Sequence, residues 1–409
     1  MTETKLGWSK VGRLWAAPIV LFMFFGNVVV AEGRVAASNA QIWQSALSQL
    51  KQNNLINALP HLEQLVTRDP SNIEYRYELA LTLLKLGQYG RAKHHLDLLS
   101  ATKLSPGARS AVENLRSQIS ERNKISGYFS FEIVPESNVA KQTENGIIDI
   151  GGIPFQLNAI GEPGVSVKID AGVQYTEKVN KNITLKIGLD LSARLNEEEK
   201  YRDISLVGRT GLAFSSTPKS SFEAGLLLGK RWLADEKYSN TSGAYFGYHR
   251  KTGQKGQVSM NLQLAHTTHV TNSPDNNIAT VQLSYTHGVS VNSQVTFGVF
   301  HQITNSSDVA TAGKNTGAKI SGLYAFPKGI VAGLSLSYAV DQREGYNPVF
   351  FTQARKDNST KLDVTLHHRD FRIGGYAPQL IMGVERNKSN NVLADYTNKY
   401  MSIGFTRKF

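Results

Sequence analysis

The sequence predicts a protein of the α plus membrane-β class, with a short N-terminal helical-repeat domain followed by a transmembrane antiparallel β-barrel of about 14 strands. Apolar residues recur at helical spacing in the first part of the chain. From residue 126 to the end they alternate with polar residues, which is the period of a strand. Long and short links follow one another between the strands, as in outer-membrane barrels. We therefore expect a leader at 1–38, a periplasmic helical domain at 39–123 and the barrel at 124–409.

Composition limits the chemistry of the chain. The 409 residues include no cysteine, which excludes disulfides, thiol catalysis and cysteine-ligated metals. The formal net charge is +12, but the basic residues are scattered and form no run. We therefore expect no nucleic-acid partner and favour an acidic membrane surface or cargo.

The N-terminus reads as a targeting segment. A few basic residues precede the apolar stretch 14–31, and small residues at 29–31 or 35–37 offer cleavage points. A signal peptide is the favoured interpretation, and an uncleaved signal anchor is the alternative. No later apolar stretch is long enough for a membrane helix, so strands must do any spanning.

The helical part repeats itself at the tetratricopeptide period. Three pairs of core residues are 34 positions apart, namely Ala58 and Ala92, Leu62 and Leu96, and Leu65 and Leu99. Such repeats stack into a curved layer whose concave face binds peptides or proteins. We expect a cargo-docking surface that includes four residues of the second repeat, Tyr75, Tyr77, Glu78 and Tyr89. The alternative is a structural plug or spacer.

The strand part opens with a hairpin over residues 165–191. Its apolar face, which includes Ile187, would contact lipid, and its opposite face carries charges that require partners or water. The charges on that face across the barrel predict a polar lumen, lined by Lys168, Asp170, Lys186, Asp190, Arg194, Arg209, Glu223, Asp363 and Glu385. These residues either keep the barrel rigid as charge pairs or line a path for passing cargo.

The predicted links differ in length on the two sides of the barrel. Short links lie near 179–182, 217–220, 252–256, 288–292, 326–329 and 371–374. Long links lie near 196–203, 233–241, 267–277, 304–316, 341–358 and 386–397. Short turns are periplasmic in bacterial barrels, and an even strand number leaves both barrel ends on that side, where the helical domain is expected.

The stretch 127–139 is an alternating strand that runs into Pro135, Glu136, Ser137 and Asn138. This sequence resembles the opening of the barrel in the surface lipoprotein assembly modulators, the Slam family. We interpret it as the motif that joins the repeat domain to the barrel. The terminal Phe409 resembles the signal read by barrel-assembly machinery, although Arg407 departs from its apolar face.

The resemblance covers nearly the whole mature chain and implies a function. Members move specific surface lipoproteins, or secreted haem- and metal-binding proteins, from the periplasm to the cell surface. The implied partners are outer-membrane lipid, the barrel-assembly machinery, a secreted or lipidated cargo protein and periplasmic chaperones. The rival functions are a polysaccharide or small-solute export porin and a structural envelope protein.

Motifs for catalysis or cofactors are weak. The stretch 225–231 resembles a phosphate-binding loop but is one residue too short and has Arg where Ser or Thr belongs. The pairs His94–His95 and His367–His368 have poor geometry for shared metal ligation. We therefore expect no enzyme, no cofactor and no metal.

Overall fold

The computed structural model describes residues 37–409 except positions 101, 103, 123, 151–152, 158–159, 218, 254, 271–272, 291, 327–328, 347–352, 369–370, 374 and 409. The predicted leader therefore lies almost wholly outside the described residues, as does Phe409. Two structural parts follow one another along the chain, helices first and strands second.

Within the described residues the first part contains five α-helices. They are α1 (Asn39–Lys51), α2 (Leu55–Arg68), α3 (Ile73–Lys85), α4 (Tyr89–Ser100) and α5 (Pro106–Arg122). Ser38 begins α1 with a capping box, and Asn72 caps α3 by accepting from two backbone N–H groups. Gly87 turns the chain from α3 to α4 with φ +72°, a conformation that residues with a Cβ rarely adopt.

The core of the helical layer is formed by the residues that gave the repeat period. Ala58, Leu62 and Leu65 are fully buried, as are Ala92 and Leu96 one period later. Small alanines at the crossing points allow the helices to approach closely. The predicted tetratricopeptide-like helical domain is confirmed.

Within the described chain the second part closes into a barrel of fourteen antiparallel strands. The strands from β4 to β16 pair in sequence order, and β1 closes the barrel by pairing with both β16 and β4. The strands are β1 (Ile125–Glu136), β4 (Gly164–Lys178), β5 (Ile183–Asn196), β6 (Asp203–Thr217), β7 (Ser220–Leu233), β8 (Glu236–Thr252), β9 (Gly256–His269), β10 (Asn276–Gly288), β11 (Ser293–Ser306), β12 (Gly313–Ala325), β13 (Ile330–Arg343), β14 (Lys356–His368), β15 (Ala377–Ser389) and β16 (Tyr396–Lys408). Closure pairs every strand on both sides, which is what a lipid environment demands. The predicted strand number is confirmed.

Three features of the strand part differ from prediction. A hairpin of β2 (Ile147–Ile150) and β3 (Ile153–Gln156) stands in the connection from β1 to β4, where none was expected. The predicted long link at 233–241 is wrong, because β7 and β8 continue to a tight turn at Ala234 and Asp235, both with positive φ. The polar residues after Asp235 suggested a loop, but they lie on strands whose pairing continues to that turn. The link from β14 to β15 is longer than predicted and begins after His368.

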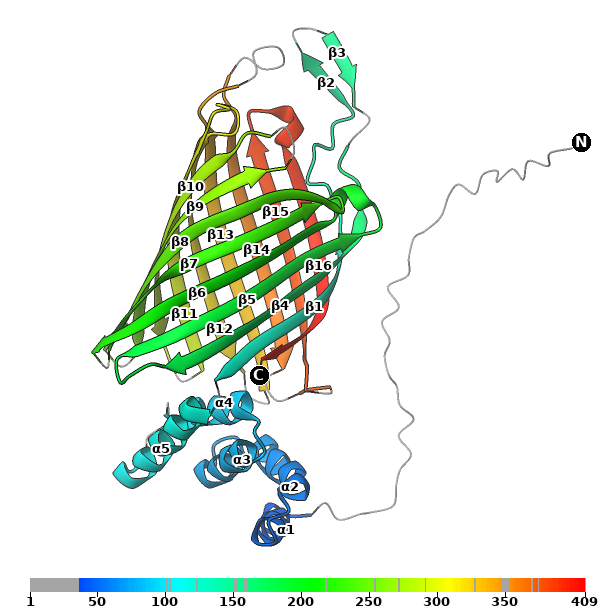
Figure 1. The fold of residues 1–409 in the computed structure, drawn as a ribbon. Helices are drawn as coiled ribbons and strands as arrows, with labels where there is room; N and C mark the ends of the chain where they lie inside the picture. The colour runs from blue at the N-terminus through cyan, green and yellow to red at the C-terminus, as the bar shows by residue number, and fades with distance from the viewer. Residues whose placement is uncertain are drawn as a thin grey trace, which may run out of the picture.

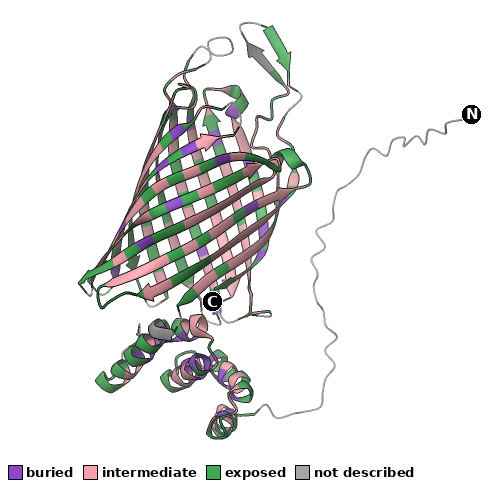
Figure 2. Cartoon of the chain, in the orientation of Figure 1, coloured by how far each residue is buried: buried purple, intermediate pink, exposed green. Residues whose placement is uncertain are grey.

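The outer surface of the barrel is apolar. Outward residues such as Leu228, Leu283 and Leu334 are 45–68% exposed, whereas their inward neighbours along each strand are mostly polar or glycine. Exposed and less exposed residues accordingly alternate along the strands in Figure 2. Exposed aromatic side chains gather near the ends of the strands closest to the helices, as in the interfacial girdles of membrane barrels: Tyr175, Phe214, Phe222, Tyr285, Phe297 and Tyr324.

The helical domain lies at one open end of the barrel, which we call the helix-side end (Figure 1). The C-terminal strand finishes at the same end, and the β2–β3 hairpin projects from the opposite, loop-side end. None of the helices described is long and apolar enough to cross a membrane.

Candidate functional site: the clefts under the helices and the barrel lumen

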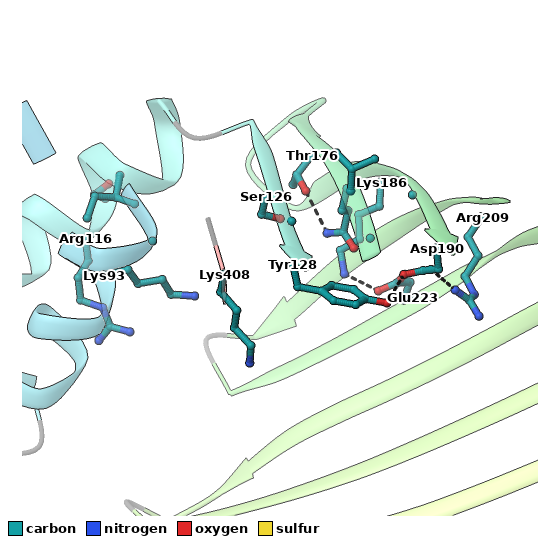
Figure 3. Close-up of a pocket in the computed structure, with 18 of the residues that line it drawn as sticks. Lys93, Arg116, Ser126, Tyr128, Thr176, Lys186, Asp190, Arg209, Glu223 and Lys408 are labelled. Carbon is teal, nitrogen blue, oxygen red and sulfur yellow. Dashed lines mark hydrogen bonds and ion pairs between the residues drawn. The ribbon is translucent and has the colours of Figure 1, made fainter. Parts of the chain in front are cut away.

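A first cleft separates α4 and α5 from the barrel and opens into the lumen. It has a volume of about 1000 Å³ and is bounded on the helical side by Lys93 and Arg116 and on the barrel side by Tyr128 and Lys186. Figure 3 shows the Lys93 and Lys408 side chains extending into this space. Arg116 is held by Asp97 at 2.9 Å (Nη2–Oδ1), whereas no ion pair within the described residues involves Lys93 or Lys408. The first cleft therefore presents cations to anything that approaches the lumen from the helical side.

A second cleft of about 910 Å³ lies on the other side of α4. Arg91, His94 and His95 of α4 face His367 and His368 at the end of β14 across it. Arg91 pairs with Glu63. Among the described residues no group of three or more His, Asp or Glu side chains is arranged to hold a metal ion.

His95 is structural in this cleft. It is 7% exposed, and its Nδ1 lies 3.3 Å from Nη1 of Arg76. Burial, with the neighbouring His94 and Arg76, lowers the pKa of His95 to about 2. The ring is therefore neutral and accepts the guanidinium hydrogen bond, which joins α3 to α4.

The four predicted docking residues are all half-buried in the helical layer. Tyr75, Tyr77 and Tyr89 are partly buried against that core, and the Tyr75 ring lies 4.9 Å from the Trp43 ring. Burial also raises the pKa of Glu78. Their role in docking stays a prediction.

Lys93 and Arg116 were missed by sequence reasoning. Arg91, Lys93 and two histidines lie close together in α4, but only the fold shows that they face the barrel.

The nine predicted lumen residues all share the inward face. Residues that are directly opposite each other on neighbouring strands share a face of the sheet. Lys168 is opposite Arg194, and Lys361 is opposite Glu385, and the same pairing places the other predicted residues of β4 to β7, β14 and β15 on the inward face. Their outward neighbour Ile187 is 47% exposed.

Most of these charges are paired, and tyrosines complete the pairs. Lys186 pairs with Glu223 and Arg209 with Asp190. Tyr245 donates to Glu223 at 3.1 Å and Tyr128 to Asp190 at 3.0 Å (Oη to carboxylate oxygen). Beyond the seam where β1 pairs with β16, tyrosines of β16 bond carboxylates of β14 and β15. Tyr400 donates to Asp363, and Tyr396 donates to Glu385 at 2.6 Å (Oη–Oε1).

The segment Pro135 to Asn138 is not where it was expected. We predicted that it joins the helical domain to the barrel, but α5 ends at Arg122 and β1 begins at Ile125, at the helix-side end. The segment leaves the other end of β1, a full strand length away. A strand of twelve residues spans the barrel, so its last residues must emerge at the loop side.

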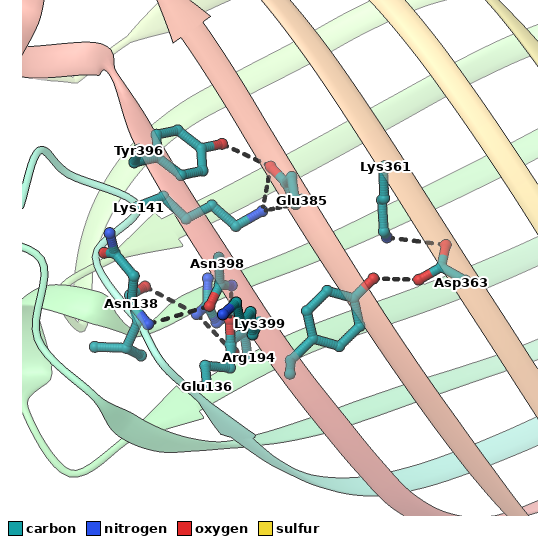
Figure 4. Close-up of polar contacts among 12 residues, drawn as sticks. Glu136, Asn138, Lys141, Arg194, Lys361, Asp363, Glu385, Tyr396, Asn398 and Lys399 are labelled. Carbon is teal, nitrogen blue, oxygen red and sulfur yellow. Dashed lines mark hydrogen bonds and ion pairs between the residues drawn. The ribbon is translucent and has the colours of Figure 1, made fainter.

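There the segment forms a polar cluster over the seam where β1 pairs with β16, and Glu136, Asn138 and Asn398 of this cluster are buried (Figure 4). The Asn138 backbone N–H donates to Asn398 Oδ1 at 3.1 Å, and Asn398 Nδ2 donates to Glu136 Oε2 at 2.8 Å. Ser137 exchanges two hydrogen bonds of 2.8 Å with Lys399. Lys141, just beyond, reaches Glu385 at 2.8 Å (Nζ–Oε2). The motif therefore fixes the first loop-side connection inside the barrel mouth.

Family models match both parts of the chain. The family model described as "Surface lipoprotein assembly modifier" matches residues 126–409, and a tetratricopeptide repeat model matches residues 49–119. The chain is 23% identical over 392 residues to surface lipoprotein assembly modifier 1 of Haemophilus influenzae, covering 90% of this chain and 77% of that protein. It is 22% identical over 383 residues to the surface lipoprotein assembly modifier of Moraxella catarrhalis, covering 90% and 72%. Among solved structures, a Pseudomonas aeruginosa FadL homologue is similar at TM-score 0.41 and 8% identity, over 70% of this chain and 90% of that one.

Proposed function

Because this chain belongs to the surface lipoprotein assembly modifier family, we propose that it is an outer-membrane translocator that delivers specific lipoproteins from the periplasm to the cell surface. The name of its relatives supplies the lipoprotein class. Secreted haem- or metal-binding proteins are part of the same proposal. The barrel lies in the outer membrane, with its helix-side end in the periplasm.

One observation carries the proposal. The helical layer lies across the helix-side mouth of the barrel, and the first cleft continues from Lys93 and Arg116 into the lumen. A repeat domain that only stiffened the envelope would have no need of a cleft shared with a lumen. In our proposal cargo meets α4 and α5 first and then enters the barrel.

Other partners follow from the location. The barrel-assembly machinery would recognise Phe409 and insert the chain into the outer membrane. Periplasmic chaperones would bind the cargo before it docks. The protein would act by binding and guiding, without a catalytic step.

The test compares cargo exposure on intact cells at matched barrel abundance. Strains would carry the full-length chain, the chain lacking residues 40–123, or none. The barrel closes its own edges, so it should fold without the helices. Surface exposure of the cognate lipoprotein should fall in both deleted strains, while cargo accumulates in the periplasm.

Two point variants sharpen the comparison in the full-length chain. Lys93→Glu reverses an exposed charge in the first cleft, and Lys51→Glu reverses an exposed charge on α1, away from both clefts. Only the first should reduce display. If no surface protein differs between full-length and null strains, the proposal is wrong. A change confined to sugar or solute release would instead identify a porin.

A further inference from the structure

The lumen has two chemically different walls. The charged wall comprises the inward faces of β14 to β16, β1 and β4 to β8. The neutral wall comprises the inward faces of β9 to β13, where side chains are mainly amides, hydroxyls and small groups, among them Asn261, Gln263, Thr280, Gln282, Ser284 and Gln302. Among the described inward residues of these five strands, Lys319, Asp341, Arg343 and His269 are the ionisable ones.

The carboxylates of the charged wall are mostly paired, whereas Lys168, Lys251 and Lys408 form no ion pair with a described residue. Glu223 and Asp190 each hold a cation and a tyrosine hydroxyl, as Asp363 and Glu385 do across the seam. Such pairs are costly to separate, since each would leave an uncompensated charge. This wall behaves as a fixed frame.

The neutral wall keeps unused hydrogen-bonding capacity at its lumen surface, because the side chains of Asn261, Gln263 and Gln282 make no hydrogen bond with another described residue. Oδ1 of Asn276, Oδ1 of Asn315 and Nδ1 of His269 also have no partner within the described residues, but these three atoms are buried. Asn276 and His269 line one cavity of about 580 Å³ at the loop-side end of the lumen. Apart from the ion pair of Arg343 with Asp341 at the loop-side end, the side-chain bonds on this wall that the described residues show are between neutral groups, such as Thr286 with Thr296 at 3.0 Å (Oγ1–Oγ1).

The two clefts under the helices adjoin only one side of the mouth. Barrel residues that line the two clefts come from β1, β4 to β8 and β14 to β16, together with the link after β14, and none comes from β9 to β13. The helix-side rim of the neutral wall therefore lies outside both clefts.

We propose that an extended, unfolded segment of the cargo polypeptide crosses the barrel along the neutral wall, while the charged wall only maintains the shape of the pore. This inference rests on the proposed function and names the path and the state of the cargo. A moving polypeptide carries peptide groups and charges of both signs. Neutral amides and hydroxyls can exchange single hydrogen bonds with its main chain, whereas unpaired charges would bind oppositely charged segments more strongly and stall them.

The test obstructs each wall after the barrel has folded. Ser284 on β10 and Ser130 on β1 are both half-buried inward serines a few residues from the helix-side end, one on each wall. The chain has no native cysteine, so Ser284→Cys and Ser130→Cys each create one thiol. Intact cells would be treated with fluorescein maleimide, and labelling of the folded, heat-modifiable barrel would be measured.

The readout is the arrival of newly made lipoprotein at the surface, followed for the lipoprotein whose exposure depends on this protein in the null strain. Labelled Ser284→Cys should lose at least fivefold in that rate, and equally labelled Ser130→Cys should keep at least half. Unlabelled variants should match the parent, which excludes a folding defect as the cause.

Equal loss from both sites, loss at Ser130 alone, or no loss at either would overturn the inference while leaving the proposed function intact. Loss of saccharide or solute release with unchanged lipoprotein arrival would also overturn it. If the null strain changes no lipoprotein, the proposed function itself fails, and the inference with it.

Discussion

Arg194 on β5 and Glu136 on β1 form an ion pair of 2.9 Å (Nη2–Oε1) across the intervening strand β4, with the Glu136 side chain only 3% exposed. Arg194 also donates to the Val139 carbonyl oxygen at 2.9 Å. One guanidinium therefore ties a lumen carboxylate to the first loop-side connection.

Removing Arg194 should destabilise the barrel strongly. Arg194→Ala leaves the buried Glu136 carboxylate without its cation, which costs about 3–5 kcal/mol for a buried pair. The measurement is the urea midpoint of unfolding in liposomes. Arg202→Ala is the control, since its partner Asp235 is 44% exposed and such surface pairs contribute about 0–1 kcal/mol. Similar decreases in the urea midpoint from the two changes would contradict the structural role of the polar cluster around Glu136.

A methyl group at Gly383 should displace Tyr400. A Cβ there would lie 2.4 Å from the Tyr400 hydroxyl, so the ring must move away from Asp363. Gly383→Ala should therefore lower stability by about 1–3 kcal/mol, as overpacking does. Gly298→Ala is the matched control, because its nearest neighbour would be the Leu283 carbonyl oxygen at 3.6 Å. Thermal midpoints from heat modifiability on gels would separate the two.

The assignment of side chains to the lipid-facing or the lumen-facing side of the barrel can be checked with two residues that are adjacent in sequence. Ile320 is 50% exposed on the outer face, and Ser321 follows it on the inner face. Ile320→Arg should cost about 2–4 kcal/mol near the bilayer midplane, whereas Ser321→Arg should fold at near-parental yield. The amount of heat-modifiable protein in outer membranes reports both, and a reversed order would refute the in–out assignment.

Topology predicts opposite labelling at the two barrel ends. Since the chain lacks cysteine, Glu344→Cys after β13 and Lys181→Cys in the β4–β5 turn each give one exposed thiol. A membrane-impermeant maleimide on intact cells should label the first and spare the second. Both should react once the outer membrane is permeabilised. Labelling of Lys181→Cys on intact cells would invert the orientation.

The helical domain should lose stability in mild acid through His95. Its folded pKa lies far below the ordinary 6.5, so the unfolded chain binds a proton there that the folded domain does not. This contribution is fully present above about pH 6.5 and declines as pH falls, by about 1.4 kcal/mol for each unit below. Amide exchange in α3 and α4 of the full-length protein, compared at pH 7.5 and 5.5, would show it. His95→Gln should flatten the dependence, and an unchanged slope would count against the role of His95.

The sequence alone determined which side of each strand faces inward and which stripe of each helix is buried, because both depend on the spacing of apolar residues. Alternation is local, and a slip of one residue would turn every side chain of a strand to the wrong face, so the pattern around Ile187 fixed which residues point inward. The 34-residue spacing of Ala58 and Ala92 likewise determined the helical packing, because each repeat must bury the same stripe. For the same reason all nine predicted lumen residues share the inward face.

Only the tertiary structure decided which residues meet across the closed ring. Asn398 and Glu136 are 262 residues apart in sequence, yet closure of β1 on β16 brings them within 2.8 Å (Nδ2–Oε2). No local pattern reports such a contact, which is why the segment from Pro135 to Asn138 was assigned to the wrong end of its strand. The same holds for Lys93, whose position in the first cleft depends on how the helical layer is placed at the barrel mouth. The spacing of apolar residues can be read from residues that are close together in the sequence. Ion pairs and clefts depend instead on how whole strands and helices are arranged in space.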